Sequence, residues 1–166
     1  MDAFETGRLQ FRPLTHADLT IIYDLYRQPE IMKYISGEPA TFAETRQLLA
    51  LHLANHEQYG FGLCAAMLKS NSQAIGRCGL LPIETPDGLE GELAWMFAKA
   101  YWNCGLATEF GLAMVEIGFR ELGLRRIVAT AASQNKASVR VMQKVGMRLM
   151  QENERGVVYE VLPSMR

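Results

Sequence analysis

The stretch "ELAWMFAKAYWNCGLATEF", residues 92–110, joins a predicted buried strand to a predicted helix. "ELAWMF" is a run of mostly large apolar residues, and a helical stripe of apolar residues starts at Leu106. Two small residues, Gly105 and Ala107, stand at the junction. A helix N-terminus leaves its first N–H groups unpaired and carries partial positive charge, and small residues let a ligand approach the backbone. The junction therefore predicts an anion site of the kind that holds phosphates.

Two common phosphate-binding loops are missing from this junction. The spacing G-x-G-x-x-G of dinucleotide-binding folds is absent, and so is G-x-x-x-x-G-K-[ST]. A phosphate site here must use another design. The alternative is that Gly105 only eases a tight turn from strand to helix, which is the simpler interpretation of a lone glycine.

Composition indicates an ordinary globular protein. The 166 residues are enough for one domain with its own core, so we expect a single domain over residues 1–166. The hydrophobic content of 49%, the charged content of 21% and the net charge of -1 argue against a nucleic-acid partner. No apolar run approaches the ~18 residues of a membrane span. Cys64, Cys78 and Cys104 lack zinc-type spacing, and no secretory segment is evident, so a reduced, cytoplasmic protein is expected.

The hydrophobic pattern predicts a mixed sheet with helices on both of its faces, an α+β fold. The order is strand, two helices, three strands, helix, strand, helix and two strands. The predicted strands cover 8–14, 61–69, 73–83, 92–97, 125–132, 147–151 and 157–162, with a turn over "ETPDGLEG". The predicted helices start at Thr15 or Asp18, at Thr41 with Glu44 as a capping box, near Leu106 and at "NKASVRVMQKV", with a short piece at "PEIMKYI".

The junction stretch resembles the cofactor-binding motif of the GNAT superfamily of acetyl-CoA-dependent N-acetyltransferases. It is most similar to the RimJ/RimL-type branch, whose pattern is roughly E-[IL]-G-Y-x-[IL]-x-P-x-Y-W-G-x-G-Y-A-T-E. "QNKASVRVMQKVGM" resembles the later motif N-x-x-S-x-x-V-x-x-x-x-G-[FM], and "ETGRLQFRPLTHADL" resembles the usual opening. The chain keeps Glu92, Leu93, Tyr101, Trp102, Gly105, Ala107, Thr108 and Glu109. The resemblance implies a GNAT fold of about seven strands and acetyl-CoA as co-substrate.

The resemblance also implies a set of cofactor-binding residues. The strand residues Trp95, Met96 and Phe97 would run beside the pantetheine arm with their backbone. The later motif would place Asn135 near the pantetheine and Ser138 near the sulfur. The pyrophosphate would lie on the backbone amides of Asn103, Cys104, Gly105, Leu106, Ala107 and Thr108.

Three residues depart from the pattern of the resemblance. Ala94 and Asn103 stand where glycine is common, and Cys104 replaces a residue that is often basic. Asn tolerates a left-handed backbone better than other non-glycine residues, so the exchange at Asn103 is mild. The exchange at Cys104 is expected to weaken the attraction of the loop for phosphate.

Acetyl transfer to an amine needs a base, because the amine arrives mostly protonated at neutral pH. Glu92 is the predicted base, although Glu90 lies close enough to compete and a solvated carboxylate at a strand edge is the simpler interpretation. The oxyanion needs a fixed donor, and a free backbone N–H in residues 92–97 would serve if the strand bulges or splays from its neighbour.

The acid that protonates the leaving thiolate is less evident. Many GNAT enzymes carry a tyrosine seven residues after the motif asparagine, and here that position holds Met142, which has no proton to give. Ser138 is the predicted donor, with unassisted departure of the thiolate as the alternative. Asn135 and Ser138 also fit a plain helix cap.

The predicted function is acetyl transfer from acetyl-CoA to a primary amine, either a protein N-terminus or a small molecule. A non-catalytic acyl-CoA sensor and a general phosphate-binding regulator are the alternatives. Residues 29–45 and the turn at 84–91 are expected to border the acceptor, and a homodimer is allowed. His52 and His56 are expected on a solvated helix face, with no metal site.

Overall fold

Eight strands form one mixed sheet in the computed structural model, which describes residues 3–163. The sheet order is β1-β2-β3-β4-β5-β6-β8-β7, and every neighbouring pair is antiparallel except β5 and β6. The strands are β1 (Phe4–Glu5), β2 (Leu9–Pro13), β3 (Leu63–Leu68), β4 (Ala74–Thr85), β5 (Gly88–Phe97), β6 (Ile127–Ala131), β7 (Arg148–Asn153) and β8 (Gly156–Val161). The predicted mixed sheet is confirmed. The predicted strand number is one short, because two-residue β1 is too brief to show alternation.

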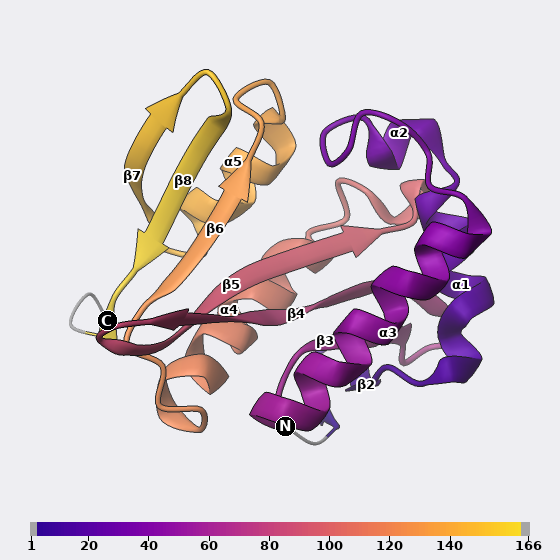
Figure 1. Cartoon of the computed structure of the whole chain (residues 1–166), viewed down its shortest axis with the longest axis horizontal. Coiled ribbons are helices and arrows are strands. Elements are labelled where there is room, and N and C mark those ends of the chain that lie inside the picture. Colours follow the sequence, from indigo (N-terminus) through magenta and orange to yellow (C-terminus); the bar gives the residue numbers. More distant parts are fainter. Residues whose placement is uncertain (1–2, 164–166) are drawn as a thin grey trace.

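Helices cover both faces of this sheet (Figure 1). They are α1 (Leu19–Tyr26), α2 (Pro29–Met32), α3 (Phe42–Tyr59), α4 (Leu106–Arg120) and α5 (Lys136–Lys144), with 3-10 turns at His16–Asp18 and Lys99–Tyr101. The larger core lies between the sheet and α4, where Leu93 of β5 packs with Phe110 and Met114. The smaller core lies under α1 to α3, where Met96 of β5 packs with Ile22. No helix within residues 3–163 is both long and apolar enough to cross a membrane.

The helix ends follow the local signals in the sequence. Thr41 and Glu44 form the predicted capping box, with the Glu44 N–H donating to Thr41 Oγ1 over 3.2 Å. Gly60 ends α3 with a left-handed φ of 73°. Asn135 caps α5, since its Oδ1 accepts the Ser138 N–H over 3.2 Å.

The hairpin of β4 and β5 is longer than predicted. Thr85 pairs with Gly88, so the turn takes only two residues and the ladder runs almost to it. The sequence suggested a longer loop because Pro86, Asp87 and Gly88 are all turn formers. The Gly88 φ of 125° shows that glycine is used at the start of β5, inside the ladder.

The prediction of a solvated face for His52 is wrong. Its side chain is buried against the sheet side of α3, and Nδ1 has no hydrogen-bond partner among residues 3–163. Burial, with a smaller contribution from nearby Arg77, lowers the pKa of His52 to about 4. No group of three or more potential metal ligands is present in the described part of the chain.

Burial of neutral His52 predicts loss of stability in mild acid. Below pH 6.5 His52 binds a proton in the unfolded chain, whereas in the folded chain it stays neutral until its pKa of about 4 is reached. The free energy of unfolding therefore falls as the pH drops from 6.5 to 4. The fall attributable to His52 is expected to be on the order of 3 kcal/mol. Urea unfolding at pH 7 and pH 4.5 measures it. His52→Gln should flatten the pH dependence, whereas exposed His16→Gln should leave it unchanged.

Candidate functional site

The parallel strands β5 and β6 separate soon after they pair. Their ladder contains only Gly91 with Ile127 and Glu92 with Val128. Beyond it, the rest of β5 is paired with β4 alone, and the two ribbons diverge (Figure 1). The strand therefore has the predicted splay, with an open backbone edge.

The open edge of β5 presents the backbone of alternate residues. The Gly91 N–H donates to the Arg126 carbonyl over 3.1 Å, on the side of β6. Since successive residues of a strand direct their N–H and C=O to opposite sides, Trp95 and Phe97 direct theirs to the opening, where the Phe97 carbonyl accepts a hydrogen bond from Trp102 Nε1 over 2.7 Å. Met96 instead directs its N–H and C=O to β4, and it is also among the residues that line the cleft. The splay leaves the N–H groups of Trp95 and Phe97 without a β6 partner, and the Trp95 N–H is the candidate donor to an oxyanion.

The N-terminus of α4 leaves its amides uncapped. Gly105 is the N-cap, with a left-handed φ of 78° and no side chain to accept a hydrogen bond. The first intrahelical bond runs from the Glu109 N–H to the Gly105 carbonyl, so the amides of Leu106, Ala107 and Thr108 have no helical partner. Asn103 has a φ of 60°, which confirms that asparagine takes a left-handed position here. The turn thus offers a cradle of donors to an anion.

The N-terminal part of the chain anchors this turn. Arg8 Nη1 donates to the Cys104 carbonyl over 2.8 Å, and Arg8 Nε pairs with Glu109 Oε2 at 2.7 Å. Burial alone would raise the pKa of Glu109, but hydrogen bonds from Thr6 and Arg8 lower it below the ordinary value. This ion pair could not be predicted from the sequence, because Arg8 is 101 positions away from Glu109. Arg8 brings a positive charge beside a loop in which Cys104 offers none.

A cleft of about 1550 Å³ lies between the diverging strands. It brings together most of the predicted site residues: Glu92, Trp95, Met96, Phe97, Asn103, Gly105, Leu106, Ala107, Thr108, Asn135 and Ser138. Cys104 is not among the lining residues, and its side chain is exposed. The cleft therefore includes its predicted neighbours Asn103 and Gly105 but not Cys104 itself. The segment after α1 borders the cleft through Ile31 and Tyr34, as predicted, whereas the turn at 84–91 does not.

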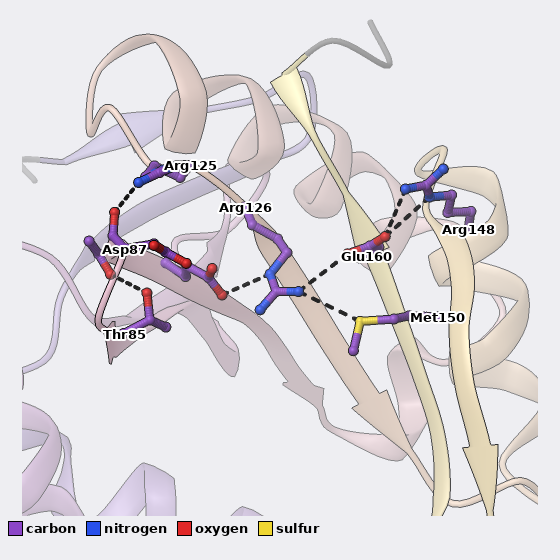
Figure 2. Close-up of polar contacts among 9 residues, drawn as sticks. Thr85, Asp87, Arg125, Arg126, Arg148, Met150 and Glu160 are labelled. Carbon is purple, nitrogen blue, oxygen red and sulfur yellow. Dashed lines mark hydrogen bonds and ion pairs between the residues drawn. The ribbon is translucent and has the colours of Figure 1, made fainter.

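The two candidate carboxylates have different surroundings. Glu92 lines the cleft, and Thr130 Oγ1 donates to its Oε1 over 2.6 Å. Glu90 is buried and lies outside the cleft lining, where Arg126 Nε pairs with it at 2.8 Å. Figure 2 shows Arg126 continuing this network to Glu160 and Arg148. Glu90 therefore belongs to a structural ion-pair network, and Glu92 is the carboxylate with access to a ligand.

Helix α5 forms another wall of the cleft. Asn135 and Ser138 both line the cleft from the first turn of this helix. The amide oxygen of Asn135 is used in the cap, and its amide nitrogen makes no hydrogen bond within the described residues. Met142 is fully buried in the main core, so the position of the usual tyrosine acid does not face the cleft in this chain.

The cysteines give no nucleophile to this cleft. Cys64 and Cys78 are direct partners in the ladder of β3 and β4, and both are buried. Burial raises the pKa of the Cys64 thiol to about 12, which keeps it protonated. No cysteine lies among the cleft-lining residues of the described chain. The arrangement therefore favours direct attack on a bound thioester over a cysteine acyl-enzyme.

Comparison with known proteins decides the family. The family model described as "Acetyltransferase (GNAT) domain" matches residues 8–148. The chain belongs to the GNAT acetyltransferase family. This GNAT protein is 31% identical over 143 residues to the uncharacterized protein YkkB of Bacillus subtilis, covering 86% of this chain and 83% of that one. It is 30% identical over 144 residues to the uncharacterized N-acetyltransferase YnaD of the same organism, with coverage of 86% and 81%.

A solved structure supports the fold of this GNAT protein. Spermidine N-acetyltransferase from Vibrio cholerae, in complex with CoA and spermine, superposes with a TM-score of 0.79 at 22% identity. The match covers 96% of this chain and 98% of that one. Membership of the GNAT family, shown by the family model, makes the protein an acetyl-CoA-dependent N-acetyltransferase. The open edge of β5 and the uncapped α4 amides fit a pantetheine arm and a pyrophosphate.

Proposed function

We propose that this GNAT protein transfers the acetyl group of acetyl-CoA to a primary amine by direct attack in a ternary complex. The observation that carries the proposal is the splay of β5 from β6, which opens one cleft to Glu92, Ser138 and the α4 N-terminus. In this cleft the acyl donor lies along the Trp95–Phe97 edge, with its pyrophosphate on the amides of 103–108. The amine approaches from the face covered by α1 and α2.

The chemistry follows from the positions of these groups. Glu92, directly or through one water, takes a proton from the ammonium form of the acceptor. The neutral nitrogen then attacks the thioester carbonyl, and the Trp95 N–H stabilises the oxyanion that forms. The carbon–sulfur bond breaks and the CoA thiolate leaves with the electron pair. The attacking nitrogen loses its second proton to this thiolate, while the Ser138 hydroxyl hydrogen-bonds the sulfur. Holding both reactants in one cleft removes much of the entropic barrier.

A turnover assay tests the proposed function. Acetyl-CoA is mixed with a panel of primary amines, and released thiol is measured together with the mass of the acetylated product. Transfer to at least one amine class is expected. Tight acetyl-CoA binding with no transfer to any amine would contradict the proposal and favour a non-catalytic acyl-CoA sensor. Adenosine nucleotides competing as well as CoA would favour a general phosphate-binding regulator.

Ser138→Ala is expected to slow the reaction without abolishing it. The hydroxyl stabilises the departing thiolate by one hydrogen bond, and such a bond to a charged group is worth about 1.5–3 kcal/mol, or ten- to a hundredfold in kcat. The affinity for acetyl-CoA should change little. The control is Ser133→Ala, since Ser133 lies near the same helix start but outside the cleft lining. Full activity of Ser138→Ala would leave solvent as the proton source, and lost CoA binding would make Ser138 a positioning residue.

The class of acceptor amine, the oligomeric state and the location of the protein are further predictions. A RimJ/RimL-like activity on protein N-termini and an activity on small amines both fit the same chemistry, and the amine panel should contain both. A homodimer and a cytoplasmic location also stay predictions. The outer edge of β7 is a candidate dimer surface, because Leu149 and Met150 are 49% and 47% exposed there.

A further inference from the structure

Arg77 shares a face of the sheet with the candidate base. In the ladder of β4 and β5, Arg77 lies opposite Met96 and Leu81 lies opposite Glu92. Cross-strand partners share a face, and so do residues four apart on one strand. Arg77 and Glu92 therefore both point to the side of α1 and α2, and both line the cleft. This is the side from which the acceptor approaches in the proposed function.

Arg77 is a partly buried cation without a carboxylate partner in residues 3–163. Its Nε donates to the Tyr26 hydroxyl over 3.0 Å, and its guanidinium lies 5.5 Å from the centre of the Tyr26 ring. Its two Nη groups make no hydrogen bond within that part of the chain. Other arginines of the sheet are ion-paired: Arg12 with Asp18, Arg126 with Glu90 and Arg148 with Glu160.

The surroundings of Arg77 offer no compensating charge. Its helix-side neighbours include buried His52, whose pKa the Arg77 charge helps to lower. The cleft-lining carboxylates are Glu30 and Glu92, and Glu30 is paired with Lys99 at 2.8 Å. Lys33 adds another positive charge to this rim. Partial burial of an unpaired cation is unfavourable, so a ligand anion would remove a penalty that the free protein carries.

We propose that Arg77 binds a carboxylate of the acceptor and thereby selects amines that also carry a negative charge. This inference rests on the proposed function. The two Nη groups form the fork that matches a carboxylate with two parallel hydrogen bonds, and Tyr26 fixes the orientation of that fork. A polycation such as spermine, which binds the Vibrio cholerae protein, would meet repulsion at Arg77.

The ladder sets the length of such an acceptor. Met96, the ladder partner of Arg77, lies four residues from Glu92 on β5. The rise along a strand makes the separation of these two positions about 13 Å. Subtracting about 3 Å of hydrogen-bond reach at each end leaves roughly 7 Å between amine and carboxylate. Two to three residues of extended peptide span roughly 7–10 Å. The acceptor class is therefore a short peptide, or an amine of similar length with a terminal carboxylate.

Triglycine and triglycinamide form a matched pair of probes, because triglycinamide carries a neutral amide in place of the C-terminal carboxylate. Steady-state kinetics at saturating acetyl-CoA should show a KM about ten- to a hundredfold lower for triglycine, the size expected for a charged hydrogen-bonded pair. Arg77→Met keeps an apolar stem against Tyr26 but lacks the charge, and it should raise the KM for triglycine alone. Triglycinamide kinetics and CoA affinity should not change. Arg77→Lys should restore part of the preference.

Three outcomes would overturn the inference. Equal kinetics of the wild-type protein with both probes would remove the carboxylate site while the proposed function stands. An equal loss for both probes in Arg77→Met would make Arg77 a structural residue that packs its stem on Tyr26. If neither probe is acetylated, calorimetry with CoA-loaded protein still decides: triglycine binding that is absent, or is unchanged by Arg77→Met, contradicts the assignment.

Discussion

Gly105→Val is expected to abolish CoA binding while the chain stays folded. Gly105 has a φ of 78°, which a β-branched residue adopts only with strain, so the turn must rearrange. Rearrangement would misalign the amides of Leu106, Ala107 and Thr108, which have no helical partner and are placed to bind phosphate. Losing two such hydrogen bonds, each about 1.5–3 kcal/mol, should raise the Kd for CoA about a hundredfold or more. Calorimetry measures the affinity, and circular dichroism checks folding.

Gly123→Val is the matched control for this variant. Gly123 has a φ of 64°, lies just beyond the other end of α4 and is not among the cleft-lining residues. An added Cβ would meet nothing within 4 Å at Gly123, so backbone strain is the main effect there. Its Tm should fall while CoA affinity is kept. CoA binding by Gly105→Val at the wild-type level would place the pyrophosphate elsewhere.

The sequence predicted those parts of the fold that depend on local signals. Thr41 with Glu44, Gly60 and Asn135 each mark a helix end through bonds within a few residues, and each lies where predicted. Alternation predicted β2, where Leu9 and Phe11 are buried and Gln10 between them is exposed, and an apolar run predicted β5. The turn after Thr85 was predicted too long, because turn-forming residues can also pair within the ladder of β4 and β5, as Gly88 does.

Parts of the cleft that depend on local backbone geometry could be predicted from the sequence. Parts that depend on contacts between side chains far apart in the sequence could not. The small-residue junction at Gly105 predicts an anion site from the sequence alone. The ion pair of Arg8 with Glu109 and the hydrogen bond of Arg77 with Tyr26 could not be predicted, because each joins segments that meet only in the folded sheet. Burial of His52 was missed for the same reason. Helical spacing alone does not show which side of α3 faces the sheet.

The separation of Glu90 from Glu92 shows how tertiary contacts assign roles to equivalent residues. Both are glutamates on one strand, two positions apart, and therefore on the same face. Arg126 pairs with Glu90 in a partly buried network, and no cation pairs with Glu92 within residues 3–163. The ion pair with Arg126 occupies Glu90 away from the cleft, whereas Glu92 has Thr130 as its hydrogen-bond partner and faces the cleft.

Glu92→Gln is expected to lower kcat most strongly at low pH. At low pH nearly all of the acceptor is ammonium, and the step that needs a base limits the rate. At high pH the acceptor arrives neutral, so the loss should shrink as the pH approaches the pKa of the amine. General-base catalysis of this kind contributes about 10²- to 10⁴-fold, which sets the expected loss at low pH. Gln keeps the size of Glu and can still accept the hydrogen bond from Thr130.

Glu30→Gln separates loss of a base from loss of a charge in the cleft. Glu30 lines the same cleft, but Lys99 holds it in an exposed ion pair, which contributes little to stability. Its variant should keep the wild-type pH–rate profile of kcat. CoA affinity should be unchanged in both variants, because neither side chain lies at the α4 amides. A Glu92→Gln profile that runs parallel to the wild-type profile across the whole pH range would remove Glu92 from proton transfer and leave water as the base.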